Sequence, residues 1–443
     1  MSNSRVLIIS PHFPPINAAD AQRVRMSLPY LDSFGWNAHI IAVHPNFVQT
    51  SQDPFLLRTV PDSVNVTHVN ALPIHKTKNF GVGSLSLRSF PYILTAGDRL
   101  LQQQKFDLVY ISTTVFPIMA LGARWQSRFG VPYVLDFQDP WLSDYYDRPG
   151  SPSPPGGRFK YGFAQLQAKI LEPKALAQVG HIISVSPTYP KVLQQHYPHL
   201  KPSQFTVLPF GAPEPDFDLL PSLQVKQTIF DRHDDKRHWV YVGRGGGDMA
   251  LTLRSLFLGI QIDRQQHPEV WKSIKLHFIG TSYAPDNRAI KTVEPIAQEL
   301  GIADLVEEYT GRIPYFEALQ TLIESDGIIL IGSDDSGYTA SKLYPCILAR
   351  KPILAVFHEQ SSVVDILTRC RAGRAVTFKT GDRPQDIAPQ VIPQLEWLRS
   401  LPTNYQPDID WQSFQPYTAK EMTRQQCAVF DRCLIPTELS KTW

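Results

Sequence analysis

The chain has 443 residues, which is too long for one ordinary hydrophobic core and favours two domains of about 200 residues each. Lysine and arginine number 43 against 41 for aspartate and glutamate, so no dominant sign of charge is present to recruit nucleic acid nonspecifically. No apolar run approaches the ~18 to 20 residues of a membrane-spanning helix, and any membrane contact is expected at the surface.

The four cysteines form no CxxC pair, and the N-terminus enters a strand pattern directly. These features predict reduced thiols in a cytoplasmic protein. A peripheral position at the inner face of a membrane stays open as an alternative.

Short runs rich in Val, Ile, Leu and Tyr recur through the first half of the chain, with enough residues between most of them for a helix. The runs are continuous rather than alternating, as expected for strands that helices cover on both faces. They predict an α/β fold with a doubly wound parallel sheet. The predicted strands are 6–10, 39–43, 64–69, 107–112, 133–137, 181–186 and 205–210.

After a polar, charged stretch the same pattern restarts, with predicted strands at 239–243, 276–280, 306–309, 328–332, 353–357 and 375–378. The sequence therefore predicts two Rossmann-like domains that face a cleft, 1–212 and 213–415. A helix in 416–443 is expected to pack back on the N-terminal domain.

A further helical pattern covers 158–177, where four large apolar residues are spaced by three or four: Phe159, Phe163, Leu166 and Ile170. Such a stripe usually packs into a core, which is the interpretation that the pattern favours. Because Lys160 and Lys169 flank the stripe, contact with a membrane surface is the alternative.

The strongest local motif is the glycine-rich run 241–248, which follows a predicted strand and precedes a helical pattern. Gly243, Gly245 and Gly246 let backbone N–H groups approach a diphosphate, and Arg244 lies within the loop. Asp248 stands where GxGxxG would have its last glycine, which disfavours an NAD site. A tight glycine turn without a ligand is the alternative.

Three more polar loops follow predicted strands of the second domain, at 280–283, 310–312 and 332–342. The candidate ligand-binding residues in these loops are Thr281, Tyr283, Tyr338, Ser341 and Lys342. Hydroxyl groups and a lysine at strand ends suit a ribose, sugar or phosphate. Ser341 has a second possible role, as the cap of the following helix.

Two loops of the first domain are expected at the same edge of their sheet. Loop 11–20 carries His12 and Asn17, and loop 136–141 carries Asp136, Gln138, Asp139 and Trp141. His12, Asp136 and Asp139 are candidate bases or acceptor-orienting groups. A packed structural histidine is the alternative for His12.

H-E-x-x-H, GxSxG and GxxxxGK[ST] do not occur in the sequence. Metalloprotease, α/β-hydrolase and P-loop chemistry therefore lack their residues. No metal and no cofactor is expected.

These motifs resemble those of the retaining GT-B glycosyltransferases of the family 4-like group. The resemblance covers nearly the whole chain topologically. It rests on Pro14-Pro15, on the run 131–141, on Val185-Ser186, on Val242-Gly243-Arg244, and on Ser341-Lys342-Leu343-Tyr344 followed by 351–355.

The resemblance implies a hexosyltransferase-like enzyme whose second domain binds a nucleotide-sugar and whose first domain binds the acceptor. Arg244 would contact the donor diphosphate, and Lys342 and Tyr344 would lie beside the nucleotide's sugar. The reaction would retain the anomeric configuration without a metal, on a saccharide, lipid-linked or small-molecule acceptor.

The sequence departs from the family at three places. The donor-binding lysine a few residues after the arginine has no counterpart, the paired glutamates fall at Gly337 and Pro345, and the histidine after the fifth strand falls at Gln138. Lys342 is the available replacement cation.

Two other classes of function stay open on these residues. A noncatalytic GT-B-like sensor or partner subunit of a polysaccharide assembly fits the missing glutamates and histidine. A nucleotide-sugar epimerase would need an acid/base pair, for which His12, Asp136 and Asp139 are candidates.

Overall fold

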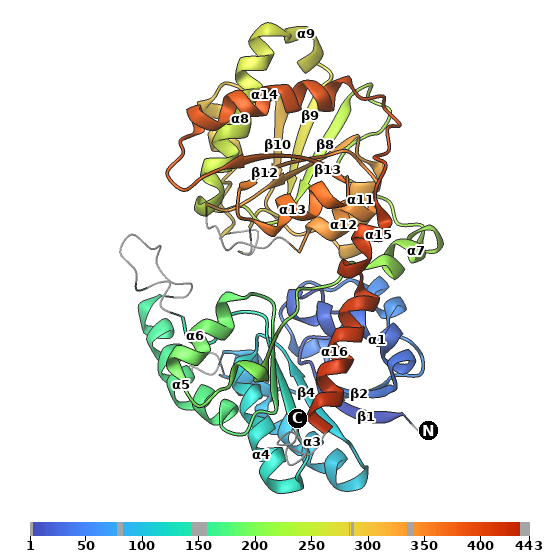
Figure 1. Cartoon of the computed structure of the whole chain (residues 1–443), viewed down its shortest axis with the longest axis vertical. Helices are drawn as coiled ribbons and strands as arrows, with labels where there is room; N and C mark the ends of the chain where they lie inside the picture. The colour runs from blue at the N-terminus through green and yellow to red at the C-terminus, as the bar shows by residue number, and fades with distance from the viewer. Residues whose placement is uncertain are drawn as a thin grey trace. The chain divides into compact units, whose positions relative to one another are not determined.

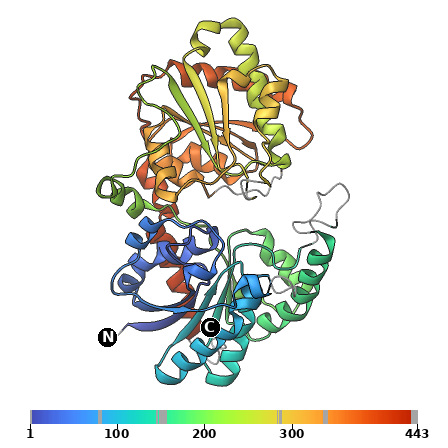
Figure 2. The same cartoon turned by 180° about the vertical axis from the view of Figure 1, so that it is seen from behind.

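The computed structural model describes residues 3–77, 83–143, 147, 157–282, 284, 288–334 and 341–434. The chain divides into two compact units, each with its own sheet and helices (Figures 1 and 2). Unit 1 comprises Met1–Gly211 and Ala419–Trp443, and unit 2 comprises Ala212–Thr418.

Unit 1 is built on a seven-stranded parallel sheet of order β3-β2-β1-β4-β5-β6-β7. Its strands are β1 Ser4–Ile9, β2 Trp36–Val43, β3 Asn65–Val69, β4 Leu108–Ser112, β5 Tyr133–Phe137, β6 His181–Ser184 and β7 Phe205–Val207. The strand order reverses between β1 and β4, and ligands of open α/β sheets bind beyond the carboxyl ends of strands at such a switch point.

Helices cover this sheet on both faces: α1 Gln22–Leu31, α2 Ile74–Thr77, α3 Leu85–Gln103, α4 Ala120–Phe129, α5 Arg158–Leu176, α6 Thr188–His196 and α16 Ala419–Leu434. Helix α16, from the end of the described chain, packs beside α1 (Figure 1). The ring of Phe430 lies 5.2 Å from that of Trp36, and the Trp36 indole donates a hydrogen bond of 2.9 Å to Asp431. The C-terminal helix is therefore part of the unit 1 core.

Unit 2 repeats the arrangement with a six-stranded parallel sheet of order β10-β9-β8-β11-β12-β13, whose switch point lies between β8 and β11. The strands are β8 Arg237–Val242, β9 Ile274–Ile279, β10 Val306–Tyr309, β11 Gly327–Ile331, β12 Ile353–His358 and β13 Gly373–Phe378. The helices are α7 Glu214–Leu223, α8 Ala250–Gln266, α9 Pro268–Trp271, α10 Glu294–Glu299, α11 Tyr315–Glu324, α12 Leu343–Leu348, α13 Ser362–Arg369, α14 Pro384–Ser400 and α15 Trp411–Phe414.

The predicted fold class is confirmed, because both sheets are parallel and lie between helices. Each predicted run forms a strand, and no strand end differs from its prediction by more than three residues. Every residue of β4, β5 and β11 is buried, which explains why their apolar runs are continuous rather than alternating.

The core packing favoured for the stripe in α5 is wrong: Phe159, Phe163, Leu166 and Ile170 are all exposed. The residues of this helix that are buried in unit 1 are Ala168, Glu172, Ala175 and Leu176. Separately, none of the helices within the described ranges is both long and apolar enough to cross a membrane.

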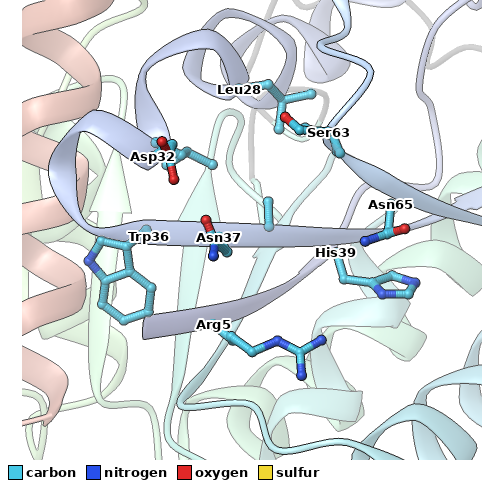
Figure 3. A pocket seen from close by; sticks show the side chains of 11 residues that line it. Arg5, Leu28, Asp32, Trp36, Asn37, His39, Ser63 and Asn65 are labelled. Carbon is cyan, nitrogen blue, oxygen red and sulfur yellow. The ribbon is translucent and has the colours of Figure 1, made fainter. Parts of the chain in front are cut away.

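A cavity of about 360 Å³ lies at the amino ends of β1, β2 and β3 (Figure 3). Arg5, Asn37, His39 and Asn65 contribute polar side chains to its lining. This cavity lies at the edge of the sheet formed by the amino ends of the strands. The predicted functional residues lie at the opposite edge, at the carboxyl ends.

Candidate functional site

The glycine loop of unit 2 begins where β8 ends and is tied to β9. The amide of Gly243 donates to the Ile279 carbonyl at 2.9 Å, and that of Gly245 donates to the Thr281 carbonyl at 2.7 Å. A Cβ atom at Gly243 would lie 2.8 Å from Lys342 Nζ, and one at Gly245 would overlap Thr292 Oγ1. Close packing therefore restricts position 245 most strongly, whereas a side chain at 243 would displace the flexible end of Lys342.

The loop leads through a short 3-10 helix, Gly247–Met249, into α8. The hydroxyl of Thr252 in the first turn of α8 donates to the Gly332 carbonyl at 2.8 Å. Gly332 follows β11 directly, so the loops after β8 and β11 are held together at the switch point of the sheet.

Arg244 is engaged by an acidic partner from the same loop. Its guanidinium donates to the two carboxylate oxygens of Asp248 at 2.9 and 2.6 Å, with both side chains about 30% exposed. Burial alone would raise the pKa of Asp248, but the hydrogen bonds and charge of Arg244 outweigh it and the pKa is lowered. An entering phosphate would compete with Asp248 for this guanidinium.

Lys342 reaches from the loop before α12 to the end of β8. Its Nζ lies 4.3 Å from the centre of the Tyr241 ring and contacts the Tyr241 hydroxyl, which in turn donates to the Arg244 carbonyl at 2.7 Å. Burial lowers the pKa of Lys342 to about 7, and the charge on Arg244 acts in the same direction. A bound anion would reverse this effect, so the position suits a phosphate.

The other residues predicted to bind the sugar donor lie in different environments. The Thr281 hydroxyl donates to Glu308 at 2.6 Å, and Tyr344 is buried with its ring stacked 5.8 Å from Tyr417. Ser341 is exposed, and no side chain in the described part of the chain caps the N-terminus of α12. Tyr283 and Tyr338 lie outside the described residues.

Glu308, at the end of β10, organises this side of unit 2. Besides Thr281 it accepts the backbone amides of Thr292, Val293 and Glu294 at 2.9 to 3.0 Å. Its carboxylate therefore holds the start of α10, and the Thr281 hydroxyl serves that structure.

In unit 1, His12 follows β1 and pairs with Asp20. His12 Nδ1 lies 2.9 and 3.0 Å from the two Asp20 oxygens. Asp20 also accepts hydrogen bonds from Thr113 and Thr114 after β4. Burial alone would raise the pKa of Asp20, but the hydrogen bond and charge of His12 with the Thr114 bonds lower it. This is the arrangement of a histidine oriented by a carboxylate.

Asp136, a predicted catalytic candidate, is fully buried. Its Oδ2 accepts from Arg23 Nε at 2.9 Å and from the Ser112 hydroxyl at 2.7 Å, and Arg23 is also fully buried. The same guanidinium donates to the Leu208 carbonyl at 2.6 Å. Asp136 therefore joins the end of β5 to α1 and to the segment after β7, which is a structural role.

Gln138 and Asn17, predicted on the acceptor side, are buried as well. The Gln138 amide donates to Asp136 Oδ2 at 3.0 Å and to the Asp20 carbonyl at 3.1 Å. The backbone amide of Asn17 donates to the Ser51 carbonyl at 2.8 Å. Gln138 thus connects the Asp136 cluster to the loop that carries His12 and Asp20.

Asp139 and Trp141 lie on the outer side of this cluster. Asp139 reaches the surface, yet burial of its carboxyl and then the negative charge of Asp20 raise its pKa. The Trp141 ring stacks on Phe116 at 5.6 Å. Of the predicted unit 1 residues, His12, Asp139 and Trp141 keep exposed surface, and His12 and Asp139 are the catalytic candidates among them.

Sequence reasoning missed the partners Asp20, Arg23, Asp248 and Glu308. Asp20 and Asp248 were visible as the acidic ends of two loops already singled out. No local signal pointed to Arg23, because its partner Asp136 lies 113 residues away.

The family model of the glycosyl transferase 4-like domain matches residues 21–211. No curated protein sequence matches the chain. Among solved structures, HepE of Anabaena in complex with UDP and glucose superposes with a TM-score of 0.54 at 14% identity, covering 99% of both chains.

Two further solved structures are similar. The Candida albicans trehalose-6-phosphate phosphatase N-terminal domain has a TM-score of 0.60 at 13% identity, with 97% of each chain covered. An E. coli structure described as trehalose-6-phosphate bound with UDP-2-fluoro glucose has a TM-score of 0.57 at 10% identity, covering 98% of this chain and 99% of the other. The chain therefore has the GT-B fold, and unit 1 matches the model of the glycosyl transferase 4-like domain.

Proposed function

We propose that the chain is a glycosyltransferase that takes its sugar from a nucleoside-diphosphate sugar held at the carboxyl ends of β8 and β11. The observation that carries the proposal is the position of two cations at the glycine loop. Arg244 lies within the loop, and Lys342 Nζ contacts Tyr241, whose hydroxyl donates to the backbone carbonyl of Arg244. Two cationic groups beside close-packed glycines suit a diphosphate. Because HepE was solved with UDP and glucose, UDP-glucose is the first donor to test.

The same cations can stabilise the negative charge of the leaving diphosphate. As the glycosidic bond of the donor breaks, negative charge grows on the diphosphate, and preorganised cationic groups stabilise that charge. We propose that Arg244 and Lys342 perform this task without a metal. Retention of the anomeric configuration is proposed from the family 4-like domain.

On the acceptor side, we propose that His12 orients or deprotonates the attacking hydroxyl, with Asp20 fixing the imidazole. The pairing at 2.9 Å supports this role, because a carboxylate on Nδ1 leaves Nε2 for the substrate. Saccharides, lipid-linked saccharides and small alcohols are the acceptor classes to screen.

The test is a thermal-shift screen of nucleotides and nucleotide-sugars, followed by transfer assays on the stabilising donor with and without EDTA. We expect one nucleotide base to stabilise the protein and transfer to survive EDTA. The anomeric coupling constant of the product, measured by NMR, tests retention.

Three outcomes would contradict parts of the proposal. If no nucleotide stabilises the protein, the proposed donor site is contradicted. Binding without transfer to any acceptor would favour the noncatalytic sensor or partner, and an altered sugar released without acceptor would favour an epimerase.

A further inference from the structure

Helix α5 carries its large apolar side chains on the side that points away from unit 1. Phe159 is 90% exposed, Phe163 55%, Leu166 57% and Ile170 50%. Steps of four, three and four residues place the four side chains on one helix face. Figure 1 shows α5 at the outside of unit 1, next to α6.

The opposite face fixes the helix to unit 1 with small and polar groups. Ala168 and Ala175 are buried, and the Ala175 carbonyl accepts the Tyr133 hydroxyl at 2.7 Å. The Glu172 carboxylate is buried and accepts the Tyr197 hydroxyl at 2.9 Å. The apolar stripe therefore faces outward because the inner face is already packed and bonded.

Positive charges border the stripe on both sides. At about 100° per residue, Lys160 and Lys174 lie along one edge of it, and Arg158 and Lys169 lie along the other. All four are exposed, whereas Glu172, the acidic residue of this helix, is buried. The outer face of α5 is therefore apolar in its middle and cationic at both edges.

Helix stability accounts for Lys174, in the last turn of α5, but not for the cations at the start of the helix. Arg158 and Lys160 lie in the first turn, where the helix dipole disfavours positive charge, and no side chain of the described residues caps this N-terminus. An acidic first turn would have been more favourable for the isolated helix. The arrangement points to an anionic partner outside the chain.

We propose that α5 docks on the surface of an anionic lipid bilayer, with Phe159, Phe163, Leu166 and Ile170 in the interfacial region. Bordering lysine and arginine side chains would extend toward lipid phosphates, as at other interfacial helices. A second copy of the same face is a poor occupant, because four cations would meet four cations across a twofold axis. The inference is independent of the donor site and needs no nucleotide for its test.

The experiment measures sedimentation of the full chain with two kinds of vesicle, one of phosphatidylcholine and one of phosphatidylcholine and phosphatidylglycerol in equal amounts. The apolar variant combines Phe159→Ser with Phe163→Ser, and its control is Ile290→Ser, at a residue of unit 2 that is 76% exposed. The charge variant combines Lys160→Gln with Lys169→Gln, and its control is Lys105→Gln, whose side chain is 90% exposed.

We expect the wild type and both controls to bind the anionic vesicles and to be released by salt. The affinity of the apolar variant for the vesicles should fall by about tenfold or more. The charge variant should lose its preference for anionic over neutral vesicles. Because the substituted side chains are exposed, melting temperatures should stay unchanged.

Failure of the wild type to bind either vesicle would overturn the proposal, as would equal binding by the apolar variant. A wild-type dimer in solution that the apolar variant converts to a monomer, without any vesicle binding, would assign the face to self-association instead.

Discussion

Lys342 Nζ lies 4.3 Å from the centre of the Tyr241 ring. Lys342, just before α12, therefore places its ammonium group over a residue at the end of β8. The ring face and the hydroxyl of Tyr241 replace part of the lost hydration of this cation. Burial nevertheless lowers its pKa to about 7. Lys342 is therefore a cation whose charge a bound diphosphate would stabilise.

Lys342→Met should weaken UDP binding roughly ten- to hundredfold, as loss of a charge-assisted contact of about 1.5 to 3 kcal/mol implies. In the wild type, affinity should fall as the pH rises above about 7, because the free protein loses the Lys342 proton that the complex retains. The variant should show a flatter profile. Calorimetric titrations at several pH values measure both effects.

The stability of the free protein provides a control on that interpretation. The pKa of Lys342 is lowered from 10.5 to about 7, so the unfolded chain holds a proton that the folded chain has lost between these values. This group therefore makes folding more favourable as the pH rises from about 7 toward 10.5. Parallel melting profiles for wild type and Lys342→Met would contradict the lowered pKa.

Asp248→Asn should strengthen UDP binding, by roughly three- to tenfold, because the carboxylate occupies the Arg244 guanidinium that the phosphate needs. The matched control is Asp304→Asn, which removes another two-point pair, with Arg264, from the surface of unit 2. The control should leave UDP affinity unchanged. Weaker binding by Asp248→Asn would mean that Asp248 orients Arg244 rather than competes for it.

Gly245→Ala should both lower the melting temperature and reduce UDP affinity, since the new methyl group would overlap Thr292 Oγ1 and push the loop away from β9. Gly247→Ala, two residues further along, would bring its methyl group within 4 Å of no atom of the described residues and should change neither property by much. Thermal melts and UDP titrations of the two variants compare the sites. Similar behaviour of both would show that the loop is looser than its hydrogen bonds indicate.

His12→Asn should lower turnover roughly a hundredfold if the imidazole moves a proton, while UDP affinity stays unchanged because the donor residues belong to unit 2.

Asp139→Asn tests the second accessible catalytic candidate of unit 1. A role in binding the acceptor predicts reduced turnover, and a structural role predicts a loss of about 1 kcal/mol of stability alone. Steady-state rates, UDP titrations and melts on each variant distinguish these outcomes. Full turnover of His12→Asn would leave Asp139 as the accessible candidate in unit 1.

Both sheets could be predicted because their strands are buried on both faces and therefore appear as continuous apolar runs, such as those of β5 and β11. Loops after these strands were found for the same reason. The roles of single residues within the loops were harder to predict. Asp136, for example, has a structural role because Arg23 reaches it from α1, which no local pattern indicates. Helix α5 was predicted, but the burial of its apolar face was wrong, because periodicity gives the existence of such a face and not the side on which it lies.

The central claim is that Arg244 binds the diphosphate of the donor, and calorimetric titration of UDP into the wild type and Arg244→Ala tests it most directly. Arg264→Ala is the control, because it breaks the equivalent pair with Asp304 elsewhere in unit 2. We predict binding to the wild type and to the control, and a loss of about tenfold or more in Arg244→Ala at an unchanged melting temperature. Equal affinity in all three proteins would contradict the claim.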